Sequence, residues 1–312
     1  MSKTIDVLSV GELLIDFLSE EYADDMRSAS RFQQYQGGSA ANFCLNLSLL
    51  GNQTKFVASV GNDAMGQFLL EKMQQYPIDC SDLAIIEGQP TTLILVTRSK
   101  ASPAFEAYRQ ADCQIRPAQI TNEVLQKVKI FHTTCFALSK QPAQTTIMEA
   151  AKKAAKYGAQ LSIDLNYAQK IWQNRQEAQT LVKQYCSYGA LVKVSEDDWT
   201  RLYQTQPPTP QQMTDFFKNL GAKEICVTLG KEGSFVSNGH ESSFVKAEQV
   251  DVVDTTGAGD AFWSGYITAK LDGYTPKQCA LAGAKMASIK LGFLGQMTEP
   301  INKDILYKNF SV

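Results

Sequence analysis

Short apolar runs rich in β-branched residues alternate with amphipathic helical stretches along almost the whole chain of 312 residues. Strand, helix, strand, repeated in this way, predicts a mainly parallel sheet with helices on both faces. The chain shows no internal repeat, so we expect one α/β domain over residues 1–312. The predicted strands are residues 5–10, 55–60, 92–97, 130–134, 160–164, 191–194 and 224–228. The predicted helices are residues 39–50, 65–75, 142–157, 175–188, 210–220, 257–271 and 276–291.

Two segments, residues 13–36 and 90–116, interrupt this alternation. Within the second, TTLILVTRSKASPAFEAYRQAD has the pattern of two strands joined by a turn near residues 99–103. We expect the two segments to form a small β lid beside the main sheet. Because unpaired strand edges can pair with a second chain, such a lid is also a candidate surface for a homodimer.

Charge and cysteine usage exclude several classes of protein. Lys+Arg 30 against Asp+Glu 32 gives a net charge of -2, without a run of five or six like charges, so we expect neither nucleic-acid nor membrane partners. The N-terminal stretch MSKTIDVLSVGELLIDF lacks an export signal, which favours the cytoplasm. Seven scattered cysteines without a C-x-x-C pair predict neither disulfides nor a zinc site. His132, one of two histidines, is interpreted as a hydrogen-bonded residue near a strand end.

Two common nucleotide-binding motifs are absent from this sequence. A dinucleotide fold needs G-x-G-x-x-G after its first strand, where this chain has Gly11-Glu12-Leu13-Leu14. A Walker loop needs G-x-x-x-x-G-K-[ST], but Gly230-Lys231 is followed by Glu232. The dehydrogenase and P-loop classes are therefore disfavoured.

The stretch DTTGAGDAF, residues 254–262, combines a glycine turn with the start of an apolar helix. Backbone N–H groups of Gly257, Ala258, Gly259 and Asp260 can hold an anion there, because the first turn of a helix has unpaired donors and a favourable dipole. A carboxylate beside an anion is unfavourable unless a neutral hydroxyl lies between them. Asp260 is therefore a candidate base that takes a proton from a hydroxyl during phosphoryl transfer, the alternative being a mere helix cap.

Two signatures far apart in the chain resemble the ribokinase-like (PfkB) family of carbohydrate kinases. One is the DTTGAGDAF stretch, and the other is GGSAANFCLNLSLLGNQTKFVASVG at residues 37–61. The resemblance reaches nearly the whole chain, and it implies an ATP- and Mg²⁺-dependent sugar kinase with a small β lid.

The resemblance also assigns a sugar site. Asp16 in GELLID matches the family aspartate that accepts hydrogen bonds from sugar hydroxyls. Gly37 and Gly38 would let the backbone approach the sugar, and Asn42 would supply both a donor and an acceptor. The alternatives are an ordinary Gly–Gly turn and a helix-capping asparagine.

On the nucleotide side, VTLGKEGSF at residues 227–235 resembles the turn that follows the ATP phosphates and ribose. This assigns Thr228, Gly230 and Gly233 to ATP, and Lys193 is placed with them. The alternative for this stretch is an ordinary hairpin.

The metal residues are implied less directly. KVSEDDW, residues 193–199, aligns with the N-x-x-E element associated with magnesium, but Ser195 replaces the asparagine and Asp198 the glutamate. Asp198 could act through a water, since Mg²⁺ keeps several waters, or the stretch could be a solvated helix start. Asp254 matches the family's monovalent-cation ligand, where a cation such as K⁺ is used.

The identity of the sugar is the harder question. Tyr108 and Arg109 match the lid pair of the fructokinase and 2-keto-3-deoxygluconate kinase branches, but Ala168 stands where these branches usually have an arginine. Gly283 is a second departure, near a family asparagine beside the adenine. An acid sugar needs fixed cations, so we expect transfer to a primary hydroxyl of a neutral ketose, most simply fructose. The alternatives are a 2-keto-3-deoxygluconate kinase, a nucleoside kinase, and a sugar- or nucleotide-sensing binding protein.

Overall fold

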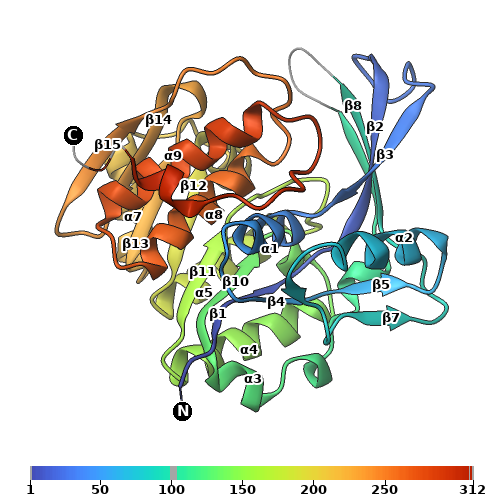
Figure 1. Cartoon of the computed structure of the whole chain (residues 1–312), viewed down its shortest axis with the longest axis horizontal. Coiled ribbons are helices and arrows are strands. Elements are labelled where there is room, and N and C mark those ends of the chain that lie inside the picture. The colour runs from blue at the N-terminus through green and yellow to red at the C-terminus, as the bar shows by residue number, and fades with distance from the viewer. Residues whose placement is uncertain (1, 99–103, 309, 311–312) are drawn as a thin grey trace.

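The computed structural model describes residues 2–98, 104–308 and 310, which form a large central sheet between two layers of helices (Figure 1). Within these residues the central sheet has nine strands in the order β15-β14-β13-β12-β11-β10-β1-β4-β6. They are β1 (Ile5–Val10), β4 (Thr54–Val57), β6 (Ile78–Asp79), β10 (Val128–Thr134), β11 (Gln160–Asp164), β12 (Leu191–Ser195), β13 (Glu224–Thr228), β14 (Gly233–Ser237) and β15 (Ser242–Lys246). The pairs from β6 to β13 are parallel, and β14 and β15 add an antiparallel edge.

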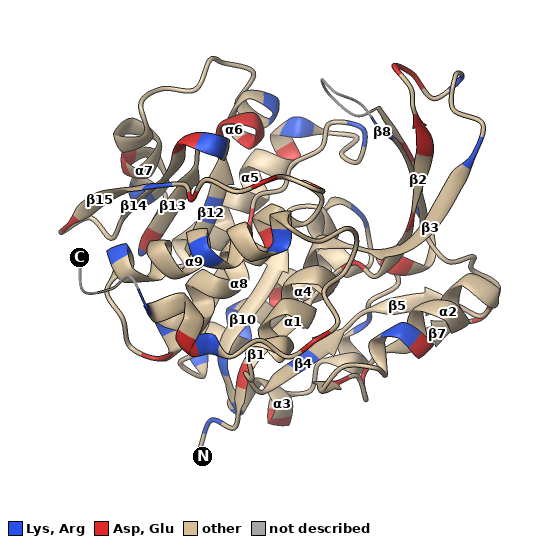
Figure 2. Cartoon of the chain, turned by 45° about the horizontal axis from the view of Figure 1, so that its top comes forward, with Lys and Arg blue, Asp and Glu red and all other residues tan. Residues whose placement is uncertain are grey.

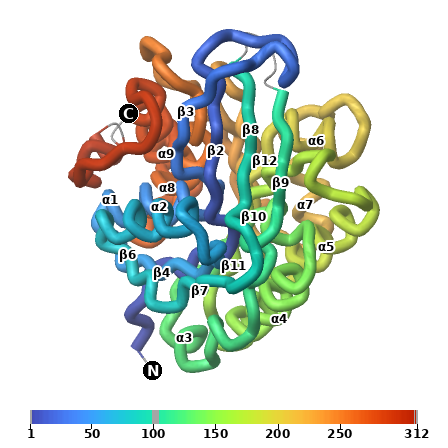
Figure 3. The backbone as a smooth tube through the Cα atoms, turned by 90° about the vertical axis from the view of Figure 1, so that its right-hand side faces the viewer, coloured from blue at the N-terminus to red at the C-terminus, as the bar shows by residue number. Residues whose placement is uncertain are grey.

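Helices cover both faces of this sheet. Figure 3 shows α1, α8 and α9 on one side and α4, α5 and α7 on the other. The helices are α1 (Ser39–Leu49), α2 (Ala64–Met73), α3 (Asn122–Gln126), α4 (Ala143–Lys156), α5 (Arg175–Ser187), α6 (Glu196–Tyr203), α7 (Pro210–Asn219), α8 (Ala258–Leu271) and α9 (Pro276–Leu291). None of the helices in the described part of the chain is long and apolar enough to cross a membrane.

Each face of the sheet has its own apolar core. Phe131 of β10 and Tyr185 of α5 are fully buried on one face. On the other face Trp263 and Tyr266 of α8 stack with ring centroids 4.6 Å apart. A buried large apolar side chain contributes roughly 1.5–3 kcal/mol. The two cores therefore fix the ends of the parallel strands, which is where open α/β sheets place their ligands.

A second, smaller sheet stands beside the central one (Figure 1). Its order is β3-β2-β8-β9, and we call it the small sheet. Its strands are β2 (Leu14–Tyr22), β3 (Phe32–Gly37), β8 (Leu93–Arg98) and β9 (Phe105–Tyr108). They come from the two segments that interrupt the strand–helix alternation, while the turn expected near residues 99–103 lies outside the described residues. Asp16 is opposite Tyr35 and Ile94 in this sheet.

One predicted strand is wrong. Residues 55–60 divide into β4, in the central sheet, and β5 (Ser59–Gly61), which pairs with β7 (Ala84–Ile86). The break is at Ala58, whose carbonyl accepts hydrogen bonds from Ala84 N–H (3.0 Å) and the Gln119 amide (2.9 Å). These outside donors turn the chain away from the central sheet.

Basic and acidic residues are interspersed over the elements seen in Figure 2. His132 lies buried on β10, and its Nδ1 is 2.9 Å from Ser162 Oγ. Burial lowers the pKa of His132 to about 3. The interpretation of His132 as a hydrogen-bonded residue of a strand is therefore confirmed. The seven cysteines are free.

Candidate active site

A cleft of about 470 Å³ opens at the carboxyl ends of β1, β11, β12 and β13. Polar side chains that end or follow these strands line it: Glu12, Asp164, Ser195 and Thr228. The small sheet contributes Asp16 on β2 and an apolar wall that includes Ile94 and Phe105. The cleft is therefore polar on the side of the central sheet and partly apolar on the side of the small sheet.

Asp260 lies in the first turn of α8 and faces this cleft. Its Oδ1 accepts a hydrogen bond from Ser39 Oγ at 2.6 Å, and its Oδ2 accepts one from Asn42 Nδ2 at 3.0 Å. Both donors belong to the first turns of α1, more than 200 positions away in sequence. The two glycine-containing signatures thus meet at one carboxylate, and they fix its orientation.

The turn before α8 leaves backbone donors open. Gly257, the N-cap, has φ 74°, a left-handed conformation that favours glycine. In the described structure the N–H groups of Gly257, Gly259 and Asp260 have no protein acceptor, whereas Ala258 N–H donates to the Thr255 carbonyl at 3.2 Å. Three of the four predicted N–H groups are thus free to hold an anion at the positive end of the helix.

A buried ion pair lies beneath this turn. Lys193 Nζ is 3.0 Å and 2.8 Å from the two carboxylate oxygens of Asp164. Although burial alone lowers the pKa of Lys193, the neighbouring carboxylates Asp164 and Asp198 raise it, so the lysine stays charged. A Cβ on Gly259 would lie 3.2 Å from Lys193 Nζ. Lys193 therefore borders the anion site and is held there by Asp164, which the sequence alone does not single out.

Asp16 approaches the backbone very closely. A Cβ on Gly37 would lie 2.1 Å from Asp16 Oδ2, so only glycine fits at position 37. At Gly38 a Cβ would lie 2.3 Å from the Glu12 carbonyl oxygen, and φ is 104°. Burial, with a smaller contribution from Asp260, raises the pKa of Asp16 to about 7. Within the described residues its carboxylate makes no hydrogen bond, which suits a group that awaits a ligand's hydroxyls.

Two residues that sequence reasoning missed, Glu12 and Gln296, hold the start of α1 in place. Glu12 Oε1 accepts hydrogen bonds from the N–H groups of Ser39 (2.9 Å) and Ala40 (3.3 Å), so it caps α1 from the end of β1. Gln296 Nε2 donates to Asn42 Oδ1 at 2.7 Å. The position of Glu12 directly after the first strand was a usable signal, whereas nothing local marks Gln296.

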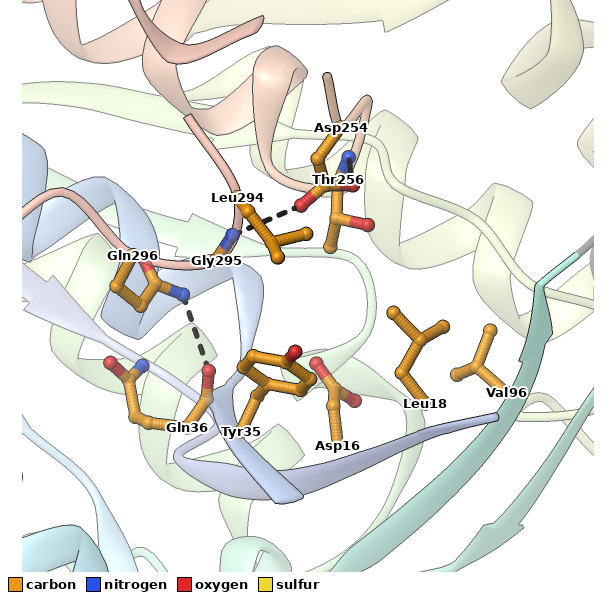
Figure 4. A pocket seen from close by; sticks show the side chains of 10 residues that line it. All are labelled: Asp16, Leu18, Tyr35, Gln36, Val96, Asp254, Thr256, Leu294, Gly295 and Gln296. Carbon is orange, nitrogen blue, oxygen red and sulfur yellow. Dashed lines mark hydrogen bonds between the residues drawn. The ribbon is translucent and has the colours of Figure 1, made fainter. Parts of the chain in front are cut away.

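A smaller pocket of about 60 Å³ adjoins Asp16 between the small sheet and residues 294–296 (Figure 4). Figure 4 shows Asp16 and Tyr35 side by side, with Leu18 and Val96 beyond them. On the opposite wall, Asp254 Oδ2 accepts a hydrogen bond from Gly295 N–H at 3.3 Å. Asp254 thus lines this smaller pocket and lies outside the main cleft.

Some predicted site residues are not in the main cleft. Arg109 pairs with Asp112, contacts Ser139 and lies over the Phe136 ring, and Tyr108 is exposed. Neither lines the cleft in the described structure, so the Tyr–Arg contact to substrate stays a prediction. Gly230 and Gly233 also do not line the cleft in the described structure. A Cβ on Gly233 would lie 2.0 Å from the Val245 carbonyl oxygen, so this glycine serves the β14–β15 pairing.

Two departures from the family pattern have structural reasons. Asp198 Oδ2 accepts hydrogen bonds from Ser195 N–H and Oγ, and its Oδ1 accepts one from Tyr167 N–H at 3.0 Å. Asp198 therefore forms a capping box with Ser195, the N-cap residue of α6. At Gly283 a Cβ would lie 2.8 Å from the Phe262 carbonyl oxygen, so any side chain would separate α8 from α9.

The pKa of Asp260 gives a pH prediction. Burial first, and then the like charge of Asp164, raise this pKa to about 6, while the Ser39 hydrogen bond holds it down. A base must be unprotonated, so kcat/KM should fall as the pH drops through about 6. Ser39→Ala removes a hydrogen bond that lowers the pKa of Asp260. The decline of kcat/KM on the acidic side of the pH profile, its acidic limb, should therefore move to higher pH.

The matched control is Ser48→Ala, because Ser48 is a buried serine of the same helix that donates to the Leu45 carbonyl. Ser48→Ala should leave the acidic limb of the kcat/KM profile at the same pH. Asp16 titrates nearby and is coupled to Asp260, but Ser39 donates to Asp260 and not to Asp16, so a shift caused by Ser39→Ala begins at Asp260. An acidic limb at the same pH in Ser39→Ala and in the unmodified protein would contradict the assignment.

A buried carboxylate at a helix N-terminus, beside free backbone donors and a cleft at the ends of parallel strands, is an arrangement that suits an α/β enzyme of phosphoryl transfer. Residues 4–302 match the pfkB family carbohydrate kinase profile. The chain is 36% identical over 297 residues to the ATP-dependent 6-phosphofructokinase of Thermoanaerobacterium thermosaccharolyticum, covering 95% of this chain and 91% of that one.

Two solved structures are also similar. The fructokinase of Halothermothrix orenii has a TM-score of 0.80 and 30% identity, covering 93% of this chain and 99% of that one. The sugar kinase PH1459 of Pyrococcus horikoshii, in complex with ATP, has a TM-score of 0.83 and 24% identity, covering 97% and 98%, which shows the fold. The chain belongs to the PfkB family of carbohydrate kinases. It is a sugar kinase with the ribokinase-like fold, and both predictions are confirmed.

Proposed function

We propose that this kinase transfers the γ-phosphoryl group of ATP to a primary hydroxyl of a neutral ketohexose, with fructose preferred. The observation that carries the proposal is the Asp260 carboxylate, oriented by Ser39 and Asn42 beside the free N–H groups at the start of α8. Asp260 takes the hydroxyl proton, and the N–H groups stabilise the charge on the transferred group. The ATP dependence of the relative from Thermoanaerobacterium supports ATP as the donor.

Magnesium fits this site chiefly through water. The Asp198 oxygens already accept three hydrogen bonds, and the described residues contain no group of three or more His, Cys, Asp or Glu that could hold a metal alone. Asp197, which also lines the cleft, has a side chain that is 79% exposed and open to metal-bound water. When bound with ATP, Mg²⁺ would neutralise phosphate charge.

The charges around the sugar side favour a neutral substrate. Ala168 lines the cleft, and the nearby Lys170 is engaged by Glu106 at 2.6 Å. Arg109 is neutralised by Asp112. A sugar carboxylate would meet Asp16 and Glu12 there, and the two cations that line the cleft in the described structure, Lys193 and Arg201, already pair with Asp164 and Asp197, so its desolvation would be poorly compensated.

A second candidate substrate is fructose 6-phosphate, because of the similarity to a 6-phosphofructokinase. A phosphate ester would need basic groups at the end of the sugar away from Asp260. The described residues lining the pocket beside Asp16 include no lysine or arginine. This charge pattern favours fructose over fructose 6-phosphate.

The test compares kcat/KM for fructose, fructose 6-phosphate and 2-keto-3-deoxygluconate at saturating MgATP. Loss of one charge-assisted hydrogen bond is worth about 1.5–3 kcal/mol, so fructose should exceed the acid sugar by about 10- to 150-fold. A higher value for fructose 6-phosphate would assign the second candidate. A higher value for the acid sugar, or turnover of a nucleoside alone, would overturn both.

A further inference from the structure

A buried ammonium group lies behind the anion-holding turn. Lys290, in the last turn of α9, has a side chain that is 4% exposed. Its Nζ donates to the Phe293 carbonyl at 3.3 Å and is 3.7 Å from Asp254 Oδ2. Its Cε is 3.7 Å from the position that a Cβ on Gly257 would occupy, so the lysine packs against the turn that begins α8.

Asp254 joins this lysine to both neighbouring segments. Its Oδ1 accepts a hydrogen bond from Thr256 N–H at 2.9 Å, and its Oδ2 accepts one from Gly295 N–H at 3.3 Å. The carboxylate therefore ties the turn at 254–257 to residues 293–295. The ammonium of Lys290 lies between the same two segments, where it balances the negative charge of Asp254.

This arrangement does not fit a monovalent metal ion. Such an ion would need oxygen ligands, and two oxygens between these segments that could serve are the Asp254 carboxylate and the Phe293 carbonyl. Both face the ammonium already. A second cation beside a fixed one in a buried setting would be repelled strongly.

We propose that the ammonium of Lys290 takes the place of a monovalent cation, so that this kinase works without K⁺. The positive charge lies behind the first turn of α8 and cancels a carboxylate that would otherwise repel the transferred phosphoryl group. Lys290 is a positioning residue, since it acts through the turn. The effect on catalysis rests on the proposed function, whereas the cation preference does not.

The first experiment needs no substrate. Thermal unfolding is compared in potassium chloride and in choline chloride of equal ionic strength. The unmodified protein should have the same Tm in both, and Lys290→Ala, which leaves room for an ion, should gain about 2–4 °C in potassium chloride. A K⁺-dependent Tm of the unmodified protein would overturn the proposal, whatever its substrate is.

The second experiment measures kcat with the sugar that gives turnover. In choline chloride Lys290→Ala should lose on the order of 10- to 100-fold in kcat, less than direct removal of an anion-hole donor, and K⁺ or NH₄⁺ should restore it. Lys285→Ala is the control, because Lys285 lies on the same helix and pairs with Glu248 at 2.9 Å away from the turn. Full activity of Lys290→Ala without K⁺, or a loss that neither cation restores, would contradict the proposal.

Discussion

Asp260→Asn is expected to lower kcat by about 10²–10⁴-fold, the usual contribution of a positioned base, while fructose affinity changes little. The amide has nearly the shape of the carboxylate but cannot take a proton. Its oxygen can still accept from Asn42, and the Ser39 hydroxyl can turn to accept from its NH₂ group. The fold and the sugar contacts should therefore survive the substitution.

Stopped assays of ADP formation measure the loss of kcat. Calorimetric titration with fructose measures whether the sugar affinity is kept. Asp215→Asn is the matched control, because Asp215 is an exposed carboxylate on α7 that does not line the cleft in the described structure. It should retain most of the activity. Near-normal turnover of Asp260→Asn would remove Asp260 from the mechanism.

Gly37→Ala should lower kcat/KM for fructose on the order of 10²-fold, mainly through weaker sugar binding. The new Cβ would lie 2.1 Å from Asp16 Oδ2 and 2.9 Å from Leu14 Cδ1, far inside contact distance. Asp16 must then move, or β3 must separate from β2 where Leu14 is paired with Gly37. Either movement displaces the carboxylate that would accept hydrogen bonds from the sugar.

Gly292→Ala is the control for adding one methyl group. Gly292 has φ −80°, and its nearest neighbour to a new Cβ is the Ile289 carbonyl oxygen at 3.4 Å. Calorimetric titration of both variants with fructose shows whether the loss of affinity is specific to position 37. If Gly37→Ala binds fructose as tightly as Gly292→Ala does, Asp16 is not a sugar ligand.

The central sheet could be predicted from the sequence because each strand is a short apolar run between helices. The strands β1, β11 and β13 have the predicted bounds. The division at Ala58 could not be predicted, because it depends on donors from Ala84 and Gln119, which are distant in sequence. The antiparallel strand β15 was also missed, since its exposed SSFVK pattern has only one buried residue.

The site was predictable where a motif provides the residues and not where partners decide their role. Asp260 of one signature meets Ser39 and Asn42 of the other. The role of Arg109 at the substrate stays a prediction, because Arg109 pairs with Asp112, three residues later, and does not line the cleft in the described structure. The partnership of Lys193 with Asp164 needs the parallel pairing of β11 and β12, which a single sequence does not show.

The most direct test of the account is phosphorus NMR of the purified protein with MgATP and fructose. We expect a fructose phosphomonoester to form in step with ADP, with little inorganic phosphate, because we propose that Asp260 takes its proton from a sugar hydroxyl and not from water. In Asp260→Asn the phosphomonoester signal should grow far more slowly. Release of inorganic phosphate alone, or ADP formation that does not depend on any sugar, would contradict the assignment of this site to sugar phosphorylation.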